Sequence, residues 1–117
     1  MKDEELTPEE VEQLAPLYER VVLALKQVYD PEIPVNIYDL GLIYELKIRR
    51  GGSVYIKMTF TAPNCPMADE VIAEVRHSVE LTPGVKDVEI DLTFDPEWDK
   101  SMLSEEAMLE LGLEPDL

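Results

Sequence analysis

A strand gives way to a helix within the sequence TFTAPNCPMA, residues 59–68. Upstream, apolar residues occupy every second position, the spacing of a half-buried strand: Val54, Ile56, Met58 and Phe60. Pro66 suits the first position of a helix, where its missing N–H costs nothing. Cys65, the only cysteine, is therefore predicted at or beside the N-cap, where unpaired N–H groups and the helix dipole favour a thiolate. A small side chain that only fills a turn is the alternative.

Apolar periodicity on either side of this stretch predicts an α+β fold. A helix is expected over residues 17–29, restarted at Pro16 after a short capped segment that begins at Thr7. Alternation predicts strands over 42–48, 54–61 and 85–94, the first two joined by a Gly-Gly turn. A long helix follows Cys65, and a short one follows Ser104. We predict a two-layer α/β sandwich in the order α-β-β-α-β plus a short C-terminal helix, with the helices on one face of a small mixed sheet.

Length and charge limit the classes of function. A chain of 117 residues holds one core, which we place in residues 17–95, with an acidic N-terminal helical extension over 1–16 and a C-terminal tail with a short helix over 96–117. The net charge of −16 argues against nucleic-acid and anionic-membrane partners. The N-terminus lacks a signal-peptide pattern, and one cysteine forms no internal disulfide, so we expect a cytoplasmic protein.

A loop of about a dozen residues, 30–41, carries the carboxylates Asp30, Glu32 and Asp39. Loops of this length are often functional, although Asp30 and Asp39 could equally be turn formers. Thr61 shares with Thr59 the face of its strand that points away from the core, and it can bring a hydroxyl near the Cys65 turn. These residues are the candidates to support Cys65.

Several chemistries lack the residues they need. The sequence has no glycine-rich phosphate loop and no paired-cysteine metal motif. His77 follows Cys65 by twelve residues, about 18 Å along a helix, and is predicted on its solvent face, so no cysteine–histidine dyad forms and we expect no enzyme. Cys65 suits a soft metal or iron–sulfur ligand better than a nucleophile. One thiolate does not hold a cluster, so a second copy, a partner or a small thiol would complete the ligand set.

Two longer motifs, YDPEIPVNIYDLGLIY over 29–44 and TFTAPNCP over 59–66, resemble the iron–sulfur cluster assembly domain of SufT-like and PaaD-like proteins. The run LTFDP, Trp98 and SEEA over 104–107 are similar too, so that the resemblance spans about residues 17–112. It implies an α+β fold and a non-catalytic scaffold, carrier or targeting adaptor, often dimeric, that acts with the assembly machinery and apo client proteins on a transient cluster or iron. The implied site is Asp30, Glu32, Thr61 and Cys65, with Asp39 nearby.

The resemblance leaves parts of the chain and two other functions open. Glu97 and Asp99-Lys100 depart from the family pattern around the tail tryptophan, and the first sixteen residues lie outside the shared domain. The alternatives are a metal-free protein–protein adaptor and a PaaD-like oxygenase maturation factor or thiol-dependent protein. The absent general base and resolving cysteine argue against the thiol-dependent chemistry.

Overall fold

The computed structural model describes residues 7–30, 33–61 and 68–112. Its regular elements follow one another in this order: α1 (Pro8–Leu25), β1 (Ile43–Ile48), β2 (Ser53–Met58), α2 (Ala68–Glu80), β3 (Asp87–Leu92) and α3 (Glu105–Glu110), with short 3-10 turns at Arg50–Gly52 and Lys100–Met102.

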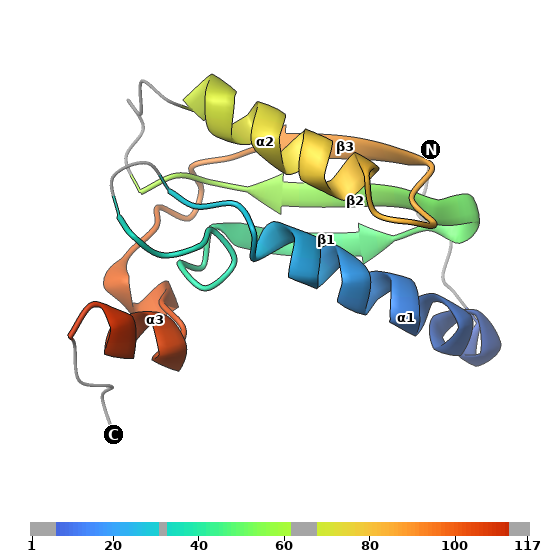
Figure 1. Cartoon of the computed structure of the whole chain (residues 1–117), viewed down its shortest axis with the longest axis horizontal. Helices are drawn as coiled ribbons and strands as arrows, with labels where there is room; N and C mark the ends of the chain where they lie inside the picture. Colours follow the sequence, from blue (N-terminus) through green and yellow to red (C-terminus); the bar gives the residue numbers. More distant parts are fainter. Residues whose placement is uncertain (1–6, 31–32, 62–67, 113–117) are drawn as a thin grey trace.

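The sheet has the order β1-β2-β3, with β1 and β2 antiparallel and β2 and β3 parallel. The two long helices, α1 and α2, both lie in front of this mixed sheet (Figure 1). Apolar side chains from both layers are buried between them, among them Val21, Leu25, Ile56, Val75 and Val79. The predicted fold class is confirmed, and the parallel β2–β3 pair follows because α2 carries the chain back across the sheet.

The first helix differs from the expectation in two respects. It runs unbroken through Pro16, so the predicted restart at that residue is wrong. Proline removes the bond to the carbonyl of Glu12, but both residues are exposed, so that water can satisfy the carbonyl. The helix also ends at Leu25 and not at Tyr29. The next residues pair with the following loop instead, where Ile37 N–H donates to Val28 O at 2.8 Å.

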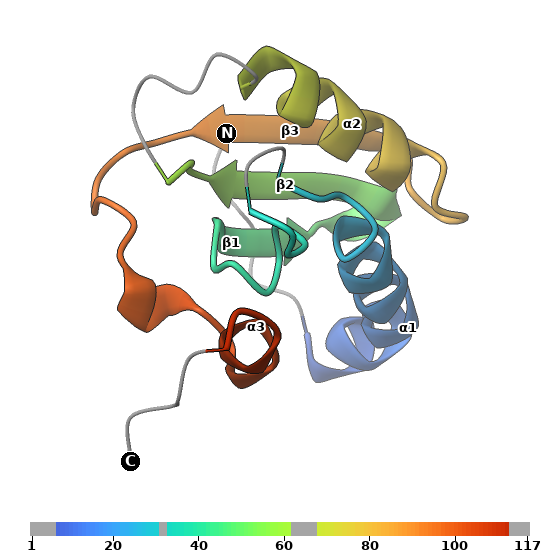
Figure 2. The same ribbon diagram turned by 60° about the vertical axis from the view of Figure 1, so that its left-hand side comes forward.

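The strands follow the predicted alternation in part: Tyr55 of β2 is buried on the face expected to be open, and Leu92 of β3 is exposed on the face expected to be buried. A further departure lies near one end of the β1–β2 pair. Strict alternation over 42–48 would place Tyr44 on the same face as Leu46 and Ile48, but the strand register shifts between Ile43 and Glu45. The Tyr44 hydroxyl instead donates to Pro96 O at 2.7 Å. Thr59, expected on an open face, is fully buried. The C-terminal segment, which contains the Pro96 acceptor, runs along this end of the sheet toward α3 (Figure 2).

Candidate functional site

The turn that carries Asp39 is closed by its own side chains. Asn36 Nδ2 donates to Asp39 Oδ2 at 2.8 Å, and Asp39 N–H donates back to Asn36 Oδ1 at 2.9 Å. The Leu40 N–H donates to Asn36 O at 3.0 Å, and Leu40 and Leu42 are fully buried. The turn is held in one conformation by the buried Leu40 and Leu42 and by the two hydrogen bonds between Asn36 and Asp39. The Asp39 carboxylate therefore has a fixed position.

Asp30 is a buried acid at the start of the same loop. Its side chain is only 8% exposed, and Oδ1 accepts a hydrogen bond from Ile33 N–H at 2.9 Å. Its own N–H donates to Val35 O at 3.3 Å. The turn-forming role that the sequence left open is thus present for Asp30 and Asp39 alike. A further role in a site stays a prediction for both.

The end of β2 lies directly beside this loop. Thr59 N–H donates to Leu42 O at 2.9 Å, which extends the β1–β2 ladder by one bond beyond Met58. Thr61, two residues further, is half-buried. The fold therefore brings the start of the TFTAPNCPMA stretch against the end of the loop that holds Asp30 and Asp39, as the predicted hairpin of the first two strands requires.

The remaining predicted site residues lie outside the described residues. Cys65 and its expected N-cap position fall within residues 62–67, and Glu32 falls within residues 31–32. The structure describes α2 from Ala68 onward. His77 is exposed on this helix, as predicted. Within the described ranges, no group of three or more His, Cys, Asp or Glu side chains could hold a metal ion.

Sequence reasoning missed the C-terminal strap, which we define as residues 93–104. Its Trp98 Nε1–H donates to Leu40 O at 2.6 Å, and Ser104 N–H donates to Asp39 O at 2.8 Å. A Cβ atom on Gly41 would lie 2.2 Å from Met102 O, so only glycine permits the strap to pass this close. The strap thus clamps three consecutive residues of the turn.

One signal in the sequence could have located the strap. Trp98 is the only tryptophan, and an indole N–H that becomes buried usually finds an acceptor. An acceptor for Trp98 was therefore to be expected, although its identity was not. The apolar Leu103 and Ala107 that follow are buried and dock α3 against the domain.

Tyr44 is the other residue held by the strap. Burial raises the pKa of its phenol above the usual 10.0; the Thr59 hydroxyl acts in the opposite direction, and the Asp99 carboxylate raises it further. The phenol is therefore protonated at neutral pH and serves as a hydrogen-bond donor to the strap. The Tyr44 hydroxyl therefore serves to hold the strap against the sheet and not as an acid–base group.

Comparisons with known proteins place this geometry in a family. The model of the family described as "Iron-sulfur cluster assembly protein" matches residues 18–92. The chain belongs to that family. The match contains the loop with Asp30 and Asp39 and the whole TFTAPNCPMA stretch, whereas the strap lies beyond it. The resemblance stated from the sequence motifs is confirmed.

Individual relatives agree. A Porphyromonas gingivalis "Fe-S protein maturation auxiliary factor" is 63% identical over 94 residues, covering 80% of this chain and 90% of that protein. A Staphylococcus aureus "Fe-S protein maturation auxiliary factor SufT" is 34% identical over 86 residues, covering 74% and 98%. A crystal structure of a "Domain of Unknown Function DUF59" from Bacillus anthracis, 30% identical, superposes with a TM-score of 0.79 over 86% of this chain and 95% of its own. No helix in the described part of this chain is long and apolar enough to cross a membrane.

Proposed function

We propose that this protein is a cytoplasmic maturation factor for iron–sulfur proteins, without catalytic activity of its own. The observation that carries the proposal is the family match over residues 18–92 together with the relatives named as Fe-S protein maturation auxiliary factors. Iron, sulfide or an assembled cluster is its cargo, and the assembly machinery and apo client proteins are its partners.

The finer proposal concerns Cys65. A thiolate is the soft ligand that iron–sulfur species require, and this chain offers a single one. Cys65 follows Thr59 by six residues, and Thr59 is hydrogen-bonded to Leu42 at the end of the acidic loop. This proximity supports a role for the loop and strand residues beside the thiol: Asp30, Glu32, Asp39 and Thr61. A second copy of the chain or a client protein supplies the missing ligands, so the cargo is held only for transfer.

The test is anaerobic incubation of the purified protein with ferrous iron and sulfide, followed by transfer to an apo-ferredoxin. We expect charge-transfer absorbance and transfer by the wild type and neither by Cys65→Ser. Ser101→Ala, which changes an exposed hydroxyl in the strap, is the matched control and should behave as wild type. Absorbance and transfer that do not depend on Cys65 would contradict cargo handling by this residue.

A metal-free adaptor is the second candidate. It is favoured by the single thiol and by the lack of a metal-binding group among the described residues. An adaptor would bind the same clients with Cys65→Ser as with wild type, in the absence of iron. Co-purification of a defined apo client with each variant separates the two functions. If the protein is instead a dedicated oxygenase maturation factor, it should bind an apo oxygenase and no other apo client protein.

A further inference from the structure

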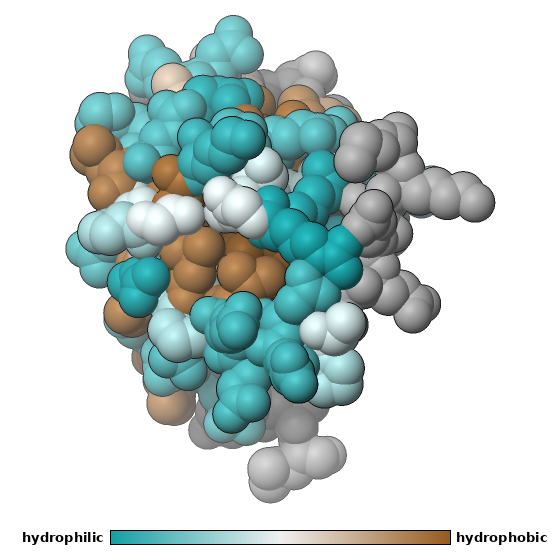
Figure 3. Space-filling model, turned by 90° about the vertical axis from the view of Figure 1, so that its right-hand side faces the viewer, coloured by the Kyte–Doolittle hydropathy of each residue, from teal (hydrophilic) through white to brown (hydrophobic). Residues whose placement is uncertain are grey.

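An apolar hollow of about 330 Å³ lies between the first half of α1 and the end of β1. It is lined by Val11, Leu14, Ala15, Tyr18, Glu19 and Ile48. Two of its apolar side chains remain open to solvent, Val11 at 53% and Tyr18 at 40% exposure. Figure 3 looks onto this end of the molecule, where apolar side chains gather between polar ones. A hollow of this size accommodates one or two aliphatic side chains of a partner.

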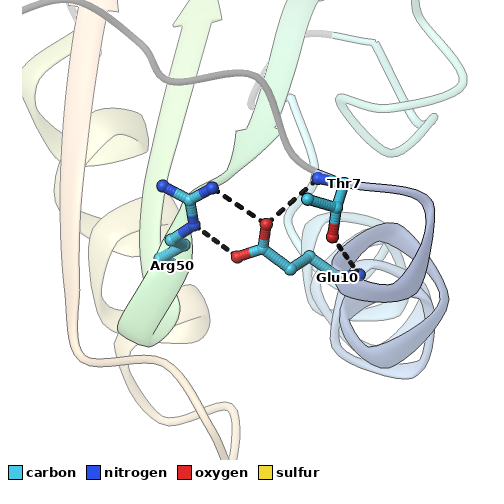
Figure 4. Close-up of polar contacts among 3 residues, drawn as sticks. All are labelled: Thr7, Glu10 and Arg50. Atoms are coloured by element: carbon cyan, nitrogen blue, oxygen red, sulfur yellow. Dashed lines mark hydrogen bonds and ion pairs between the residues drawn. The ribbon is translucent and has the colours of Figure 1, made fainter.

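The hollow is a preformed feature of the fold. Thr7 caps α1 with its side chain, and Glu10 closes the capping box by accepting from Thr7 N–H at 3.0 Å. The same Glu10 carboxylate pairs with Arg50 Nε and accepts from its Nη2 at 2.9 Å (Figure 4). This pair ties the start of α1 to the turn between β1 and β2, so the two walls of the hollow keep their spacing. A preformed site binds without first paying the entropy of closure.

The first half of α1 presents acidic side chains beside the hollow. Glu12 and Glu19 are exposed and seven residues apart, which places them on the same side of α1, within about 20° of each other, with Ala15 between them. Arg50, a cation beside the start of α1, is paired with Glu10. In a symmetric dimer, a second copy of the chain would bring its own Glu12 and Glu19 against Glu12 and Glu19 of the first. Each copy carries a net charge of −16, so electrostatic repulsion disfavours self-association at this surface.

We infer that this hollow, the α1–β1 groove, docks a basic segment of a partner protein. The segment inserts one or two aliphatic side chains between Val11, Tyr18 and Ile48. It places cations against Glu12 and Glu19, which are separated by about 10 Å along the helix. That spacing corresponds to Lys or Arg residues seven positions apart on a helix, or about three apart in an extended chain. Groove filling supplies affinity and the two acids select the charge of the partner.

The inference is independent of the proposed function. The first half of α1, which lines the groove, lies at one end of the long axis, and the loop that follows α1 lies toward the other end (Figure 1). Val11, Leu14 and Ala15 also precede the part of the chain that the family model matches. A partner held in the groove therefore leaves the loop and the end of β2 uncovered.

The experiment uses full-length ¹⁵N-labelled protein and an Ala-based helical peptide with Lys at positions i and i+7 and Leu at i+3 and i+4. We expect saturable amide shift changes confined to residues around the groove. A peptide with Ser in place of Leu, and one with Glu in place of Lys, should each bind at least about tenfold more weakly. Shift changes spread over other faces of the protein would overturn the inference.

Ala15→Glu separates groove docking from general attraction between opposite charges. It adds a carboxylate, so pure attraction predicts tighter binding of the Lys peptide. Groove docking predicts a loss of about tenfold or more, because a charged side chain enters the apolar hollow. The matched control is Ala73→Glu on the exposed face of α2, which should bind within about twofold of wild type. Equal or tighter binding by Ala15→Glu would overturn the inference, as would a dimer of the wild type that Ala15→Glu converts to a monomer.

Discussion

Gly41→Ala tests whether the C-terminal strap holds the turn that carries Asp39. Gly41 has φ +80, and an added Cβ would lie 2.2 Å from Met102 O. Gly51 is the matched position, with φ +79 and nothing within 4 Å of an added Cβ. Both substitutions force alanine into the left-handed region, at a cost of about 1 kcal/mol each. Only the substitution at Gly41 must also displace the strap.

The additional cost at Gly41 can be worked from the contacts that the displacement breaks. The strap donates two hydrogen bonds to the turn, from Trp98 to Leu40 O at 2.6 Å and from Ser104 to Asp39 O at 2.8 Å. Each contributes about 1 kcal/mol net. Gly41→Ala should therefore lower the free energy of unfolding by about 3 kcal/mol in total, against about 1 kcal/mol for Gly51→Ala.

Urea unfolding followed in parallel by tryptophan fluorescence and far-UV circular dichroism measures this difference. Trp98 is the only tryptophan, so its fluorescence reports on the strap itself, whereas the dichroism reports on the helices. In Gly41→Ala we expect the Trp98 fluorescence to differ from that of the wild type already without urea and the dichroism midpoint to fall, and in Gly51→Ala we expect wild-type fluorescence and a smaller fall in the midpoint. Equal shifts of the urea midpoint in the two variants would show that the C-terminal strap does not hold the turn.

Three further predictions follow from single side chains. Trp98→Phe keeps an aromatic ring but loses the donor to Leu40 O, and should cost about 1 kcal/mol in the same urea experiment, whereas a cost near zero would mean that the hydrogen bond is not made in solution. Asp30→Ala leaves the N–H of Ile33 without its acceptor and should lower the free energy of unfolding by about 1–2 kcal/mol. Asp30→Asn retains an acceptor and should lower it by less than half as much. Equal losses in the two variants would contradict the turn-forming role. The hydrogen bond to Asp91, with burial second, raises the pKa of Tyr55 from 10.0 to about 12, so its contribution to stability is complete below pH 10 and is lost as pH rises toward 12. Tyr55→Phe should flatten the thermal stability profile over that interval, and an unchanged slope would argue against the bond.

Local patterns were sufficient for most of the fold. Alternation predicts β1 and β2, and the helix predicted after Cys65 is α2, whose Val71, Val75 and Val79 are buried at helical spacing. Ser104 was recognised as the N-cap of α3, where its Oγ accepts from Ala107 N–H at 3.1 Å. These features depend on neighbours within a few residues, which is the range over which a single sequence carries information.

The features that escaped prediction depend on contacts between distant segments. Pro16 could remain inside α1 because the carbonyl it leaves unpaired belongs to Glu12 on the solvent side. Thr59 is buried, although its strand position predicted exposure, and its side chain contacts the Tyr44 phenol that donates to the strap. Of the candidate site residues, Asp30, Asp39 and Thr61 could be placed, while Cys65 and Glu32 lie outside the described residues.

Maturation through Cys65 is measured most directly by the activity of a cluster-dependent dehydratase in cells that lack this protein. The wild-type chain and Cys65→Ser are each returned at equal abundance, with Ser101→Ala as the control. We expect the wild type and the control to restore the activity and Cys65→Ser to leave it absent. Full restoration by Cys65→Ser would contradict maturation through this thiol.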